Sequence, residues 1–242
     1  MRERDEIEDP RRLFLVRALA SGLFIMGASA GVVRPVVAGL LGRVPKELPP
    51  GKSIYEMKGE VFVNGAKATI DTMIGPNDTV ETRKGSRIIF VVGKDAFILR
   101  QNSQLKLSGG NVVIEALRLL SGALLSVFGK TDHRINTVTA TIGIRGTGIY
   151  VESEPDQSYV CTCYGISEIE AVKDPSSTET IFSEHHDAPR YVLAGEPEGR
   201  KIRPAPFKNH TDVELMLIEE LVGRAPPFMF SGGRYRSPRR GY

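Results

Sequence analysis

From Lys52 onward the sequence alternates short strand-forming runs with turn residues, and this pattern limits the fold more than any other feature. GEVFV at residues 59–63 is followed by Asn64-Gly65, a dipeptide typical of two-residue hairpin turns. Further runs, such as RIIFVV at residues 87–92, are separated by turn residues roughly every 8–12 positions. Such spacing predicts an all-β domain, a sandwich or roll of many short strands.

The stretch at residues 137–152, TVTATIGIRGTGIYVE, carries three glycines inside a strand pattern. Glycine within a strand marks a bulge, a tight bend or a close backbone approach. We therefore expect one strand that kinks and continues, with Arg145 at the kink. Residues 111–130 have both helical and strand periodicity, but Ser121-Gly122 interrupts them. We interpret them as two strands around Gly122.

The N-terminus predicts export. Residues 1–12 are highly charged, and the apolar run that follows is shorter than the roughly 20 residues of a membrane-spanning helix. Its Gly, Ala and Ser content fits the apolar region of an export signal, and a twin-arginine pattern, RRxFL, precedes it. We expect a periplasmic protein; the alternatives are an ordinary secretory signal and an uncleaved inner-membrane anchor with the domain facing the periplasm. The residues of the pattern are Arg11, Arg12, Phe14 and Leu15.

A single helix is expected near the C-terminus. Thr211 and Glu214 form a capping-box pattern before an amphipathic run, and Gly223 stands near its end. The Pro/Gly/Arg-rich tail beyond it is typical of disorder. The expected regions are an export signal or anchor helix (1–41), a linker (42–51), a β-domain with a C-terminal extension (52–195), the helix (211–224) and the disordered tail (225–242).

Two cysteines and two histidines form a candidate metal site. Cys161 and Cys163 are two residues apart, so on a strand both thiols point to the same side. His185 and His186 follow in a polar loop. Thiolate and imidazole are ligands suited to zinc or copper. We expect one histidine to join the cysteines, because adjacent residues of an extended strand point in opposite directions.

Two other interpretations of the cysteines stay open. They are also typical of small buried core residues, and they could form a redox-active pair. The two remaining histidines, His133 and His210, stand alone in the sequence and are expected at the surface.

The ordered set of motifs resembles the FecR domain over roughly Lys52–Val172. The matching segments are GEVFVNGAKATI, ETRKGSRIIFVVGKDAFILRQNSQLKL, LLSGALLSVF and TVTATIGIRGTGIYV. The most specific match is the IRGT core together with the glycine before it. Its signature residues are Gly143, Arg145, Gly146 and Thr147. The resemblance implies an all-β, exported sensory domain; the best-known members carry a signal from an iron-chelate receptor to a sigma factor.

These features predict a non-enzymatic protein. The sequence has no recognisable catalytic constellation, and a net charge of +3 does not demand an anionic partner. Twelve residues before Leu13 are too few for a sigma-binding domain, so we expect an exported domain that binds a ligand or an envelope protein in sensing or iron-linked regulation. The alternatives are a metal or redox module and a membrane-anchored regulator of an extracytoplasmic sigma factor. No nucleic-acid partner is expected, and membrane contact is expected only through an uncleaved N-terminal segment.

Overall fold

The computed structural model describes residues 47–111, 113–195 and 201–229. All of them belong to one unit, Lys46–Tyr242. The expected export signal at residues 1–41, with its twin-arginine pattern, lies outside the described residues, as does most of the expected tail. Within the described part, no helix has the length and apolar character needed to cross a membrane.

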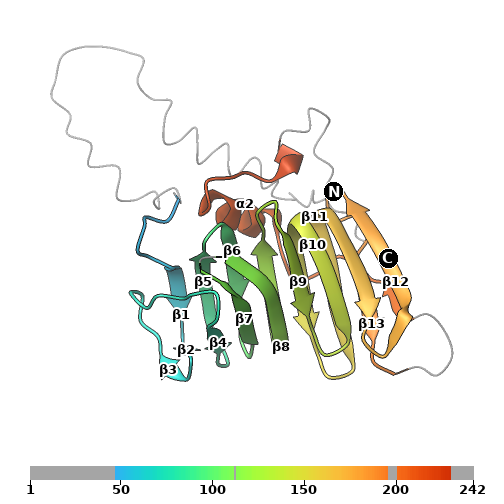
Figure 1. Ribbon diagram of the computed structural model, residues 1–242, viewed down its shortest axis with the longest axis horizontal. Helices are drawn as coiled ribbons and strands as arrows, with labels where there is room; N and C mark the ends of the chain where they lie inside the picture. Colours follow the sequence, from blue (N-terminus) through green and yellow to red (C-terminus); the bar gives the residue numbers. More distant parts are fainter. Residues whose placement is uncertain (1–46, 112, 196–200, 230–242) are drawn as a thin grey trace, which may run out of the picture. The chain divides into compact units, whose positions relative to one another are not determined.

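The described chain is all-β with one α-helix near the C-terminus, as the sequence predicts (Figure 1). The elements are β1 (Ile54–Lys58), β2 (Val61–Val63), β3 (Ala66–Lys67), β4 (Thr79–Thr82), β5 (Arg87–Val92), β6 (Asp95–Leu99), β7 (Gln104–Gly110), β8 (Val113–Val127), β9 (Asp132–Asn136), β10 (Ala140–Ser153), β11 (Gln157–Ala171), β12 (Asp174–Ser183), β13 (Arg190–Leu193), β14 (Ile202–Pro204), α2 (Asp212–Glu220) and the 3₁₀ turn η2 (Pro227–Met229).

Each of the three long strands, β8, β10 and β11, changes its hydrogen-bonding partners partway along. In β8 the residues up to Ser121 pair with β7, whereas the residues from Gly122 pair with β10, and the last four of them also pair with β6 on the other side. The two strands expected around Gly122 are therefore one strand. Glycine at positive φ lets a strand bend sharply without ending. The glycines at the three bends are Gly122, Gly146 and Gly165.

The partner changes divide the strands into two layers that share the three long strands. The first layer runs β14, β13, β11, β10, β8, β6, β5 and β1, using the start of β11 and the ends of β10 and β8. The second layer contains β12, the remaining halves of the long strands, β9, β7, β4, β2 and β3. Sandwich strands that pass between layers commonly do so at such bends.

The first layer is apolar on both faces. Phe97 and Leu124 point into the larger apolar cluster, which residues of both layers share. Their chain neighbours Ile98 and Leu125 point the other way, into a second cluster with α2. Because successive strand residues face opposite sides, this second cluster lies on the outer face of the first layer. A helix is needed there to cover it.

Helix α2 provides that cover. Its N-cap is Thr211, and the predicted capping box with Glu214 is present. Leu215 and Ile218 are fully buried against the first layer, where each contributes about 1.5–3 kcal/mol of apolar burial. Figure 1 shows α2 beside β6 and β8, the strands with which its contacts are most extensive.

The IRGT core forms the bend of β10. The Thr147 hydroxyl is fully buried, 2.9 Å from the carbonyl oxygens of Arg145 and Ile166, while the Arg145 side chain is 74% exposed. A Cβ at Gly148 would lie 2.6 Å from Cζ of Tyr164, so only glycine lets that ring lie across the strand. The kink expected at Arg145 is confirmed, and these residues shape the backbone.

Candidate metal centre

Cys161 and Cys163 lie in the first half of β11 and point to the outer face of the first layer. Both belong to the apolar cluster beneath α2, whereas Val160 between Tyr159 and Cys161 points into the sandwich. The prediction that the two thiols share one side of a strand is confirmed. Both cysteines are free and 0% exposed.

His186 reaches the cysteines from the loop after β12. Its φ of 56° is uncommon outside glycine and differs from the extended backbone of the strand before it. Its backbone N–H donates to the Cys163 carbonyl oxygen at 2.9 Å. The Asp187 carboxylate accepts from the N–H groups of Glu184 and His185 at 2.8 and 3.1 Å, which fixes the loop. The loop therefore holds His186 against β11 through both its backbone and its side chain.

His210 joins the site from the turn before α2. The expectation that it lies at the surface is wrong, as it is for His133, because the two residues are 3% and 4% exposed. The His210 ring stacks on Tyr150 with centroids 4.5 Å apart, and its Nδ1 is 2.7 Å from the Lys208 carbonyl oxygen. In the sequence, only the position of His210 directly before the predicted capping box indicated that it packs into the domain together with a helix.

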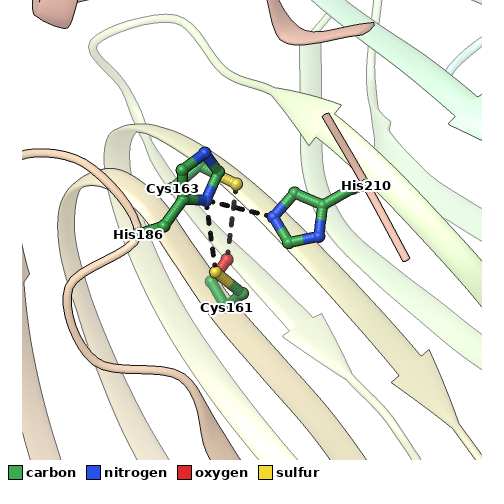
Figure 2. Close-up of side chains that lie close together, drawn as sticks. All are labelled: Cys161, Cys163, His186 and His210. Atoms are coloured by element: carbon green, nitrogen blue, oxygen red, sulfur yellow. Dashed lines mark hydrogen bonds between the residues drawn. The ribbon is translucent and has the colours of Figure 1, made fainter. Parts of the chain in front are cut away.

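Figure 2 shows the four side chains converging from three segments of the chain. His186 Nδ1 lies 3.4 Å from Cys161 Sγ and 3.1 Å from His210 Nε2, and all four ligand atoms, with Cys163 Sγ, lie within 4.8 Å of one another. In a tetrahedral zinc site the ligand atoms are roughly 3.3–3.8 Å apart. The four residues therefore fit one ion with ligand shifts of about 1 Å or less.

Hydrogen bonds on the outer sides of the rings determine which nitrogens face inward unprotonated. His186 Nε2 is 3.0 Å from Asp212 Oδ1, and His210 Nδ1 faces a carbonyl oxygen, so these nitrogens carry the protons. The neutral rings then direct two lone pairs at each other across 3.1 Å. Two acceptors at that distance need a proton or a cation between them. A metal ion satisfies both, and the Asp212–His186 bond is the usual outer support of a histidine ligand.

His185, the other predicted histidine, is not part of the four-residue cluster. Its Nε2 lies 2.9 Å from the same Asp212 oxygen that His186 contacts. Of the residues predicted from the sequence, the structure thus brings together Cys161, Cys163 and His186, and it adds His210. His185, His186 and Asp212 form a second group of potential ligands, which competes with the four-residue cluster for His186.

Protons balance the charges within the metal-free cluster. Burial acts to raise the pKa of Cys161, but its hydrogen bonds with Cys163, His186 and His210 outweigh burial and hold that pKa well below the usual value. Burial raises the pKa of Cys163 well above its usual value. Burial acts to lower the pKa of His186, yet Asp212 and Cys161 raise it to about 9. One thiolate beside an imidazolium is therefore the metal-free state, and metal binding displaces protons.

Cys161, His186 and Asp212 also stand in the order of a nucleophile, a base and an orienting carboxylate. Their depth argues against that use, since Cys161 is 0% exposed and His186 is 2% exposed. Four converging protein ligands fill a tetrahedral shell and leave no position open for a substrate. The arrangement is suited to a structural metal ion.

The chain matches no protein-family model and no curated protein. Two solved structures of a candidate anti-sigma factor from Parabacteroides distasonis are similar to part of it. One is 13% identical with a TM-score of 0.44, and the other is 12% identical with a TM-score of 0.43. Each match covers 52% of this chain and 58% of the solved chain, so it spans little more than half of that protein.

Proposed function

We propose that this domain binds one zinc ion through Cys161, Cys163, His186 and His210, and that the ion has a structural, non-catalytic role. The observation that carries the proposal is the convergence of four buried soft-to-borderline ligands from three separate chain segments. A shell made entirely of protein ligands is typical of structural zinc.

Charge favours zinc over cuprous copper at this site. Two thiolates carry a charge of −2, so a divalent ion makes the buried centre neutral, whereas Cu⁺ leaves a charge of −1. Asp212, which is 8% exposed, adds further negative charge next to His186. Uncompensated charge away from water is costly, and the divalent ion removes most of it.

In a wider setting, the domain serves as an exported regulatory module that binds an envelope protein, with iron-linked signalling as the specific case. The resemblance to the FecR domain supports this role, and the twin-arginine pattern fits a protein that folds around its metal before export. An uncleaved N-terminal anchor would make it a membrane-bound regulator of a sigma factor. Cross-linking in intact cells tests the role. If it captured no envelope partner, and if deletion of the gene left transcription unchanged, the regulatory role would be wrong.

Native mass spectrometry of the full chain tests the zinc proposal. Protein made in zinc-containing medium is expected to carry one zinc ion under native conditions and none after acid unfolding. The double variant Cys161→Ser/Cys163→Ser is the control and is expected to carry none. If the native protein instead carried no metal and its two thiols reacted only after unfolding, the cysteines would be ordinary core residues.

A further inference from the structure

We infer that zinc fastens residues 205–229 to the first layer, so that loss of the ion releases this segment locally. The inference rests on the proposed zinc site. We call residues 205–229 the C-terminal strap; it contains α2 and η2. It starts where the Ala205 N–H donates to the Pro189 carbonyl oxygen at 2.9 Å.

The ion would join the strap to the sheet. Cys161 and Cys163 belong to β11, in the middle of the first layer, while His210 belongs to the strap. One tetrahedral ion bonded to all three links segments that are about 50 residues apart in sequence. His210 directly precedes the N-cap of α2, so the link acts at the start of the helix.

A second contact makes the helix start depend on the same site. Asp212, the first residue of α2, accepts from His186, which would be a ligand itself. Without the ion, His186 and His210 direct two ring nitrogens at each other across 3.1 Å. The metal-free strap therefore loses the metal bond at His210, and only a hydrogen bond between the two rings takes its place.

One further polar contact of the strap is buried: the Tyr164 hydroxyl of β11 donates to the Glu219 carboxylate of α2. Others lie closer to solvent. Arg100 contacts both carboxylate oxygens of Glu214 at 3.0 Å, with side chains 25% and 19% exposed. Lys208 contacts Glu152 at 2.7 Å. Partly exposed ion pairs contribute little to stability. The apolar side of α2 and the Tyr164–Glu219 hydrogen bond provide the main metal-independent contacts, and the zinc link adds to them at the start of the helix.

Opening the strap would uncover an apolar surface on the first layer. The strap residues Leu215, Ile218, Leu221 and Phe228 are at most 8% exposed. Their buried partners in the cluster come from five strands, β5, β6, β8, β10 and β11. These partners include Ile98, Leu125, Val127, Tyr150, Tyr159 and Tyr164. Zinc availability would thus decide whether this surface and the apolar side of α2 are covered.

The size of the effect follows from linkage. An ion that binds the closed state alone shifts the opening equilibrium by a factor of 1 + [Zn]/Kd. With free zinc at about 100 times Kd, the closed state gains about 100-fold. Amide exchange of α2 reports this equilibrium directly, because exchange requires local opening.

Hydrogen exchange of the full chain, with and without zinc, tests the inference. Zinc removal is expected to speed exchange of the α2 amides about 100-fold, and in the zinc-free chain these amides are expected to exchange faster than those of β7, because the strap opens while the second layer stays folded. His210→Ala is expected to give fast α2 exchange even with zinc present. Arg100→Ala, which removes the exposed Glu214 contact, is expected to keep the zinc response.

The outcomes separate the two proposals because zinc content is measured on the same samples. If the protein bound zinc but removal of the zinc left exchange of the α2 amides unchanged, the strap inference would be wrong and the zinc site would stand. Zinc-free protein in which the α2 amides exchange no faster than those of β7 would also overturn it, because the strap would then open only when the whole domain unfolds. Protein that binds no zinc at all would overturn both.

Discussion

Removal of zinc from the full chain is expected to lower its midpoint of thermal unfolding by about 8–16 °C. An ion present at about 1,000 times its Kd stabilises the state that binds it by about 4 kcal/mol. In a domain of this size, each kcal/mol shifts the midpoint by about 2–4 °C. Differential scanning calorimetry before and after dialysis against a chelator, with zinc then restored, measures the shift.

The matched control is Cys161→Ser/Cys163→Ser, which loses both sulfur ligands with little change of side-chain volume. Its thermal unfolding midpoint is expected to resemble that of the zinc-free protein and to stay the same after dialysis against the chelator. If calorimetry gave the same midpoint for zinc-loaded and stripped native protein, the ion would not be bound by the folded state and the structural role would be wrong.

His210→Ala is expected to weaken zinc binding by about 100-fold, whereas His185→Ala should stay within about tenfold. A structural zinc ion contributes about 10–16 kcal/mol, so one of four ligands accounts for roughly 3 kcal/mol. Each 1.4 kcal/mol is a factor of ten in affinity. His185 contacts Asp212, and Asp212 in turn contacts His186, so His185 affects the zinc site only indirectly. Competition titration against a zinc-binding dye measures both constants.

The pair of variants also decides between the two groups of potential ligands. His210 belongs only to the cluster with the cysteines, and His185 belongs only to the group with Asp212. If His185→Ala lost zinc while His210→Ala kept it, the ion would sit between the two adjacent histidines and Asp212, and the cysteines would be core residues.

The sequence predicts the elements of this fold better than their arrangement. The Asn64-Gly65 hairpin and the capping box at Thr211 are local patterns with local physical causes, and both are present. The two strands expected around Gly122 proved to be one. A glycine that bends a strand between layers has the same local signature as one that ends it, and the strand partners that distinguish the two come from elsewhere in the chain.

The site was predicted in the same partial way. The i, i+2 spacing placed Cys161 and Cys163 on one side of a strand, because strand geometry alone determines this. The choice between His185 and His186 depended on backbone conformation in a loop, which spacing does not determine. His210 was missed because it approaches β11 only when α2 covers the first layer, a packing event between segments about 50 residues apart.

Zinc K-edge X-ray absorption of the zinc-loaded full chain tests the central claim most directly. A shell of two sulfurs at about 2.3 Å and two nitrogens at about 2.0–2.1 Å is the expected result. His210→Ala should retain both sulfurs and lose one imidazole. A shell of nitrogen and oxygen without sulfur would contradict the account, because the ion would then be bound away from Cys161 and Cys163.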